Sequence, residues 1–189
     1  MIKIAIVGNI ASGKSTVEQI LDNLGYKVLD TDNVCHKLLD SVDVVSAFKN
    51  YDVFDNGKIS RSKLGNLVFS NDKLKTTLEN LMYPMVRKEI EDFFEQNNTE
   101  ALVFVSAPQL FEARMEDLFD KILFIYCDDA IREHRLILRN NYTKEYAKLR
   151  MSKQMSQDEK AKKADWIIYN NDSVKDLMER IVSLIEQIR

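Results

Sequence analysis

The feature that most constrains this chain is an eight-residue segment near its start. Residues 8–15 read Gly-Asn-Ile-Ala-Ser-Gly-Lys-Ser, which fits the pattern G-x-x-x-x-G-K-[ST], and they directly follow the apolar run Ile2–Val7. Residues 17–24 then place apolar side chains at helical spacing, and Gly25 supplies a stop signal. A strand, a glycine-containing loop and a helix in this order predict a loop that binds the phosphates of a nucleoside triphosphate.

The chemistry of phosphate binding explains the residue types in this loop. Gly8 and Gly13 let the backbone turn with its N–H groups pointing inward, so that they and the next helix N-terminus cradle the β-phosphate. Lys14 is expected to bridge β- and γ-phosphate oxygens, and the Ser15 hydroxyl is expected to bind Mg²⁺. The predicted nucleotide-binding set at the loop is Gly8, Ala11, Ser12, Gly13, Lys14, Ser15 and Thr16.

Length and composition limit what can accompany this loop. With 189 residues, 45% of them hydrophobic, the chain can bury the core of one domain, and we expect a single domain over residues 1–189. The net charge is −3 and the basic residues are dispersed, which disfavours binding to long nucleic acid. The apolar N-terminus is too short for a signal peptide, and no stretch approaches the roughly 18 apolar residues of a membrane span. We therefore expect a cytoplasmic protein with no membrane partner.

Two cysteines, Cys35 and Cys127, lie far apart in the sequence. They match no paired metal-ligand spacing, and two are too few for a disulfide scaffold. We expect both to be reduced and structural.

The order of apolar and amphipathic segments predicts an α/β fold. Continuous apolar runs suit a parallel sheet that is covered on both faces. Such runs occur at residues 2–7, 27–29, 101–107, 122–126 and 166–169. The last segment, behind a capping box at Ser173–Asp176, is an amphipathic helix whose apolar stripe serves packing. Residues 31–100 are too long for one crossover and indicate several helices, interrupted by a turn at 55–58, that are well placed to hold a second substrate.

Two acidic residues follow the second predicted strand. The carboxyl ends of strands face the ligand crevice in open α/β sheets, so Asp30 and Asp32 are candidates for contact with the second substrate. Alternation along a strand predicts that their side chains share a direction. Asp32 also precedes a helical stretch, and its alternative role is that of an N-cap.

A basic segment follows the fourth predicted strand, in the helical stretch 129–164. Arg135 and Arg139 are four residues apart and share a helix face, which favours an anion partner for at least one of them. The other basic residues of this stretch are interpreted as a solvated face.

Three further polar residues were weighed for a role in the chemistry. Glu112, after the third predicted strand, could contact a metal through water or begin a helix. His36 and His134 are isolated and are interpreted as polar surface residues.

Beyond the phosphate loop, segments along almost the whole chain resemble the dephospho-CoA kinase family, in the adenylate-kinase-like branch of phosphate-loop proteins. The resemblance lies in segments that are quoted in chain order: Ile6–Val17, Asp30–Asp32, Phe54–Arg61, Leu64-Gly65, Val68-Phe69, Leu78-Glu79, Pro84–Arg87, Ala107–Glu112, Arg135–Arg139, Gln154 and Ala164–Asn170. The loop alone is shared by many families, whereas these segments in this order are specific.

The resemblance implies a phosphate-loop NTPase-type three-layer fold with a five-stranded parallel sheet. It also implies a helical acceptor-binding insertion at about residues 33–95 and a helical lid at about residues 132–160. The implied reaction is the phosphorylation of the ribose 3′-hydroxyl of dephospho-CoA by ATP with Mg²⁺, the last step of coenzyme A synthesis. We expect a monomer or a weak homo-oligomer that acts on this small molecule.

The resemblance also assigns roles to single residues. Asp32 would be the general base or orienter of the 3′-hydroxyl, and Arg139 a lid arginine that reaches the ATP phosphates. Asn170 would lie beside the adenine. The residues implied in acceptor binding are Asp30, Asp32, Tyr83 and Arg87.

Three positions depart from the family pattern. Tyr83 stands where the family usually has histidine before Pro84, Gln109 where it usually has leucine, and Arg132 where it usually has glutamine. The first two put the affinity and the identity of the acceptor in question, so a kinase of another small hydroxyl compound, such as a nucleoside or nucleotide, is the alternative. A GTPase-type switch is disfavoured because the chain has no Asn-Lys-x-Asp segment; residues 170–172 lack the lysine.

Overall fold

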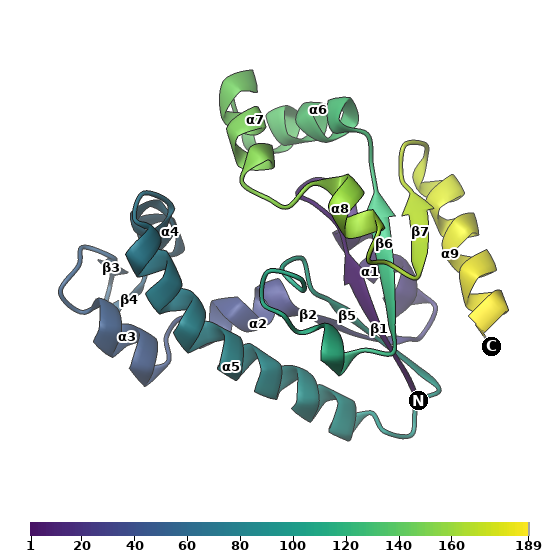
Figure 1. Cartoon of the computed structure of the whole chain (residues 1–189), viewed down its shortest axis with the longest axis horizontal. Helices are drawn as coiled ribbons and strands as arrows, with labels where there is room; N and C mark the ends of the chain where they lie inside the picture. The colour runs from purple at the N-terminus through teal and green to yellow at the C-terminus, as the bar shows by residue number, and fades with distance from the viewer. Residues whose placement is uncertain (189) are drawn as a thin grey trace. The chain divides into compact units, whose positions relative to one another are not determined.

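A computed structural model describes residues 1–188, which form two compact units (Figure 1). The first unit comprises residues 1–29 and 97–188, and the second comprises Asp30–Gln96. Each unit has a hydrophobic core of its own. The predicted insertion, residues 33–95, falls within the second unit.

The first unit is built on a five-stranded parallel sheet with the strand order β2-β5-β1-β6-β7. The strands are β1 (Ile2–Val7), β2 (Lys27–Asp30), β5 (Leu102–Ser106), β6 (Lys121–Tyr126) and β7 (Trp166–Tyr169). They coincide with the five apolar runs, so the predicted fold class is confirmed. β1 is central and pairs with β5 on one side and β6 on the other. All five residues of β5 are buried, as continuous apolar runs predict.

Helices α1 and α9 share one core with the sheet. The helices of this unit are α1 (Lys14–Asn23), α6 (Asp129–Asn140), α7 (Lys144–Ser152), α8 (Gln157–Ala161) and α9 (Val174–Ile188), with the short 3₁₀ helix η1 (Glu116–Leu118). Ile4 and Ile6 of β1, which alternation places on the same face, pack with Leu21 of α1 and Ile181 of α9. The helical stretch predicted for 129–164 is divided into α6, α7 and α8, and α6 ends at Asn141 in a left-handed conformation.

The capping box before α9 is confirmed. The backbone N–H of Ser173 donates to Asp176 Oδ2 at 3.1 Å, and the Asp176 N–H donates to Ser173 Oγ at 3.3 Å. Leu177, Ile181 and Ile185 then bury the predicted apolar stripe. This helix serves packing, as its sequence indicated.

The second unit is mainly helical. Its elements are α2 (Thr31–Leu38), α3 (Val42–Phe48), β3 (Phe54–Asp55), β4 (Lys58–Ile59), α4 (Arg61–Phe69) and α5 (Asp72–Gln96). The long helix α5 contacts α2, α3 and α4. Val44, Phe48 and Leu64 are buried in the core of this unit with Met82 of α5. Among residues 1–188, no helix has both the length and the apolar character that crossing a membrane requires.

The predicted turn at residues 55–58 is the tip of a small β-hairpin. Asn56 and Gly57 both have positive φ angles, 51° and 79°, which suits the two central residues of a hairpin turn. Phe54 pairs with Ile59 across the hairpin. The sequence predicted the turn but not the strands, because strands of two residues each are too short to show alternation.

Candidate active site: the phosphate loop and its supports

The phosphate loop follows β1 and leads into α1, and its two glycines are required for different reasons. A Cβ atom on Gly8 would lie 2.5 Å from Ser12 Oγ and 3.0 Å from the Ile125 carbonyl oxygen. Gly13 has a φ of 99°, and a Cβ there would lie 2.0 Å from Asn170 Nδ2. Gly8 is therefore fixed by space, whereas Gly13 is fixed by space and by backbone conformation.

Three consecutive carbonyl groups of the loop accept hydrogen bonds from residues far away in the sequence. Arg132 Nε donates to the Ile10 carbonyl at 3.0 Å, and Arg135 Nη1 donates to the Ala11 carbonyl at 3.4 Å. Asn170 Nδ2 donates to the Ser12 carbonyl at 2.7 Å. The loop therefore does not depend on its own residues alone to keep its shape.

The start of α1 has the features of an anion site. Its N-cap is Gly13, which makes no side-chain capping bond, and its first turn contains no acidic residue. The N–H groups and the positive end of the helix dipole at this terminus suit a phosphate group. Ser15 is exposed in this first turn, and Lys14 Nζ lies 2.9 Å from the Gly8 carbonyl oxygen, to which it donates.

The chain offers little else for a metal ion. Among residues 1–188, no group of three or more His, Cys, Asp or Glu side chains could hold one. Mg²⁺ is usually bound by one or two protein ligands together with substrate phosphates and water. Ser15 stays the predicted protein ligand.

The arginines of α6 are arranged differently from the prediction. Arg132 and Arg135, three residues apart, both donate to the loop, and Arg135 Nη2 also donates to the Asn170 carbonyl at 3.2 Å. Arg139 is exposed near the end of α6, where its Nε donates to Asn140 Oδ1 at 3.0 Å. The predicted pair of Arg135 and Arg139 therefore omits Arg132, although the helical spacing of residues 132 and 135 already indicates a shared face. The contact of Arg139 with ATP stays a prediction.

Asn170 is buried at the end of β7 and supports the loop. Its backbone N–H donates to the Tyr126 carbonyl at 2.8 Å, in addition to the side-chain bond to Ser12. Its predicted place beside the adenine stays a prediction, while its contribution to loop shape was not foreseen.

Glu112 forms an ion pair instead of beginning a helix. Residues 108–114 adopt turns, so the helix-start alternative is wrong. The fully buried Lys160 Nζ lies 2.9 Å from Glu112 Oε1 and donates to the Pro108 carbonyl at 3.0 Å. A buried ammonium needs such partners, and Glu112 supplies the charge.

In the second unit, the acidic pair lies at the start of α2. β2 ends at Asp30 and α2 begins at Thr31, so the strand alternation expected for Asp30 and Asp32 does not apply. The alternative role of Asp32, that of an N-cap, is also wrong. Asp30 is the N-cap, and its Oδ1 accepts the Asp32 N–H at 2.9 Å. The helix begins earlier than its apolar pattern, because the side chain of Asp30 supplies the cap.

Asp32 therefore lies in the first turn of α2, with an exposed side chain. A carboxylate at this position is stabilised as an anion by the helix dipole, and an anionic oxygen can accept a proton or hydrogen bond from a hydroxyl group. Burial, with the charges of Asp32 and Asp30, raises the pKa of the Cys35 thiol to about 11. Burial and Arg61 lower the pKa of His36. Both cysteines are free, as predicted.

Tyr83 and Arg87 lie one turn apart on α5, in the same unit as the acidic pair. Arg87 Nη1 lies 3.6 Å from Glu91 Oε1, one further turn along the helix. The helical spacing puts Tyr83 and Arg87 on one face of α5. Their part in acceptor binding stays a prediction.

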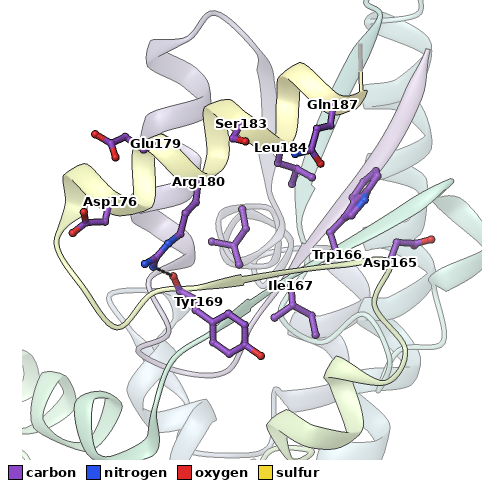
Figure 2. A pocket seen from close by; sticks show the side chains of 11 residues that line it. Asp165, Trp166, Ile167, Tyr169, Asp176, Glu179, Arg180, Ser183, Leu184 and Gln187 are labelled. Atoms are coloured by element: carbon purple, nitrogen blue, oxygen red, sulfur yellow. Dashed lines mark hydrogen bonds between the residues drawn. The ribbon is translucent and has the colours of Figure 1, made fainter.

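A groove of about 680 Å³ lies away from the phosphate loop, between the edge strand β7 and α9 (Figure 2). Its charged side chains have local partners. Arg180 donates to the Tyr169 carbonyl and pairs with Asp172, and Asp165 pairs with Lys121 at 2.7 Å. Arg180 thereby occupies an acceptor of the sheet edge, which discourages pairing with another strand.

The nucleotide loop after the central strand of a parallel sheet defines a phosphate-loop nucleotide-binding protein, and comparison with known proteins gives the family. The family model described as dephospho-CoA kinase matches residues 2–176. A dephospho-CoA kinase from Listeria innocua is 34% identical over 193 aligned residues, which cover 97% of this chain and 96% of the relative. The chain belongs to the dephospho-CoA kinase family, as its motifs predicted.

Solved structures agree with this membership. The dephospho-CoA kinase from Campylobacter jejuni is 32% identical, with a TM-score of 0.75, and the match covers 98% of this chain and 96% of that one. The crystal structure of TT1252 from Thermus thermophilus is 30% identical, with a TM-score of 0.87, and covers 100% of this chain and 98% of that one. The protein is a kinase, which decides against the nucleotide switch.

Proposed function

We propose that the chain transfers the γ-phosphoryl group of ATP to the ribose 3′-hydroxyl of dephospho-CoA, with Mg²⁺, as the last step of coenzyme A synthesis. The observation that carries the proposal is the phosphate loop, whose carbonyl groups are held by Arg132, Arg135 and Asn170, in a chain that matches this family along its length. This small-molecule role fits a cytoplasmic enzyme that acts as a monomer or a weak homo-oligomer.

The donor side rests on the loop and the start of α1. The backbone of Gly8–Gly13 and the helix N-terminus bind the β-phosphate, and the Lys14 ammonium neutralises charge that develops between the β- and γ-phosphates. Mg²⁺, held by Ser15 and the phosphates, supplies further positive charge when bound. Arg139 reaches the same phosphates from the lid.

The acceptor side rests on Asp32. Its carboxylate accepts the proton of the 3′-hydroxyl while that oxygen forms a bond to the γ-phosphorus, and the bond from phosphorus to the β,γ-bridging oxygen breaks to release ADP. Asp30, Tyr83 and Arg87 bind the remainder of dephospho-CoA. Closure of the lid, residues 132–160, excludes water, which competes as an acceptor.

The experiment is an assay of ADP release with ATP, Mg²⁺ and a panel of acceptors: dephospho-CoA, adenosine, AMP and a deoxynucleoside. Dephospho-CoA is expected to raise ADP release far above the rate without acceptor. If a nucleoside supports turnover and dephospho-CoA does not, the proposal fails, and the departures at Tyr83 and Gln109 are the first residues to examine as the cause.

A further inference from the structure

Ala11, in the middle of the phosphate loop, has a backbone conformation that costs free energy. Its φ is 62°, in the left-handed region, where a residue with a Cβ atom is crowded against its own backbone. Such a conformation persists only where surrounding groups hold it. The peptides on either side of Ala11 are the place to look for those groups.

Both flanking carbonyl groups are held by α6. The Ile10 carbonyl accepts from Arg132 Nε at 3.0 Å, which is a normal hydrogen-bond length, while the Ala11 carbonyl accepts from Arg135 Nη1 at a longer 3.4 Å. The N–H of Ile10, which belongs to the preceding peptide between Asn9 and Ile10, donates to Gln154 Oε1 at 2.8 Å. The two peptides before Ala11 are therefore both held by residues from outside the loop, and Arg132 holds the oxygen of the second.

Arg132 is itself held in place. Its side chain is 3% exposed, and its Nη1 lies 2.7 Å from Asp129 Oδ1. The same Asp129 oxygen accepts from Gln157 Nε2, which also donates to the Cys127 carbonyl, each at 2.9 Å. The arginine is thus anchored through Asp129 and Gln157 to the end of β6.

The polarity of Arg132 is not explained by packing. Residues 1–188 supply no hydrogen-bond partner for its buried Nη2, and burial lowers the pKa of the guanidinium while Asp129 raises it. A buried charged group is costly, and an apolar side chain of similar size would avoid that cost if filling space were the whole role. What an apolar side chain cannot supply is the hydrogen bond to the Ile10 carbonyl.

We infer that Arg132 is a positioning residue that holds the phosphate loop in its ATP-binding shape by fixing the peptide before the left-handed Ala11. The inference rests on the proposed use of this loop for ATP, and it does not depend on which acceptor is phosphorylated. Arg132 is inferred to act through the loop, because its Nε donates to the Ile10 carbonyl.

The first test is Arg132→Met, with direct titration of ATP binding in the absence of any acceptor. Loss of a charge-assisted hydrogen bond is expected to weaken ATP binding about tenfold, while KM for dephospho-CoA changes less than twofold. Arg180→Met is the matched control, because Arg180 also contacts one backbone carbonyl and one aspartate, but at the edge of the sheet. The control is expected to leave ATP binding unchanged.

The second test separates positioning from general destabilisation. Glycine adopts left-handed backbone without steric cost, so Ala11→Gly relieves the strain that Arg132 opposes. We expect Ala11→Gly to tighten ATP binding more in the Arg132→Met background than in the unsubstituted enzyme, whereas a merely structural loss would not be rescued in this way. If Arg132→Met does not fold, Arg132→Leu, which also lacks a hydrogen-bond donor, is tested in the same cycle.

Unchanged ATP binding in the Arg132 variant, or an equal effect of Ala11→Gly in both backgrounds, would overturn the inference. Weakened ATP binding that Ala11→Gly rescues supports it, even where dephospho-CoA proves not to be the acceptor. Failure of the inference and failure of the proposed function are thereby distinguishable.

Discussion

The chain has two strand-to-helix junctions that carry its candidate chemistry, and they are built in opposite ways. Between β1 and α1 lies a loop of six residues, 8–13; α1 has no side-chain cap and no acidic residue in its first turn. Between β2 and α2 there is no loop, Asp30 caps the helix with its side chain, and Asp32 lies in the first turn. One helix N-terminus is left open to an anion from outside, while the other is occupied by carboxylates of the protein.

This difference matches the two tasks of a kinase. The open terminus attracts phosphate groups, since its dipole and N–H groups have no acidic side chain to satisfy them. The occupied terminus repels phosphates and presents an anionic oxygen that suits the proton of a hydroxyl group. The same local structure thus serves donor and acceptor chemistry according to which residues stand in its first turn.

The largest expected effect comes from removing the charge of Lys14, at the junction between β1 and α1. Lys14→Ala is expected to lower the turnover number by about 10³-fold, because charge that develops on the γ-phosphate is no longer neutralised. The measurement is steady-state ADP release, with Lys88→Ala as a control, since Lys88 pairs with the surface carboxylate of Asp92 on its own helix. Normal turnover of the Lys14 variant would refute the role of the loop in transfer.

The next largest effect is expected from a substitution of Asp32, at the junction between β2 and α2. Asp32→Asn keeps the size of the side chain but removes the proton acceptor, so we expect turnover to fall by about 10²-fold or more while ATP binding and folding are preserved. The measurements are the turnover number and a separate ATP titration. If turnover stays near normal, Asp32 is an exposed acidic residue of a helix terminus and no more.

A smaller effect, on stability, is expected from Asp30, which caps α2 and is not the proposed proton acceptor. Asp30→Ala removes the N-cap of α2 and is expected to lower the free energy of unfolding by about 1 kcal/mol. Asp30→Asn, in which the amide oxygen can still accept the Asp32 N–H, is the control and should unfold at nearly the same denaturant concentration as the unsubstituted protein. Equal loss in both variants would show that charge, not capping, is what Asp30 contributes.

The smallest expected effect is a change in the pKa of Cys35, which lies on α2 with Asp32. Burial, then Asp32 and Asp30, raise the pKa of Cys35 from an ordinary 9.0 to about 11. Between these two pH values the folded protein keeps the thiol proton, whereas the unfolded chain has released it. The stability from this group is complete below pH 9 and is lost as the pH rises towards 11. Alkylation of Cys35, followed by peptide mass spectrometry against pH, should show a midpoint near 11 that falls in Asp32→Asn. An unchanged midpoint would mean that the charge of Asp32 does not contribute to the raised pKa of Cys35.

Much of the first unit could be predicted from the sequence. Apolar runs gave all five strands, since buried parallel strands are apolar on both faces, and the loop motif fixed the conformation around Gly8 and Gly13. The capping box at Ser173 was visible because its two partners are three residues apart. In each case the interacting residues are neighbours in the chain or share a period.

What could not be predicted depends on contacts between distant residues. The hydrogen bond of Arg132 to Ile10 spans 122 residues, and the bond of Asn170 to Ser12 spans 158. Helix α2 begins at Thr31, two residues before the predicted start. The reason is that Asp30 is both the last residue of β2 and the N-cap of α2. Helix ends and long-range supports of a loop are set by the folded structure and leave little trace in local sequence.

The most direct test of phosphoryl transfer to the ribose is a comparison of dephospho-CoA with its 3′-deoxy analogue, followed by mass spectrometry of the products. We expect dephospho-CoA to gain one phosphoryl group in an ATP-dependent reaction, and the 3′-deoxy analogue to remain unmodified while still competing with dephospho-CoA for binding. Phosphorylation of the 3′-deoxy analogue, or no phosphorylated product from dephospho-CoA, would contradict transfer to the 3′-hydroxyl.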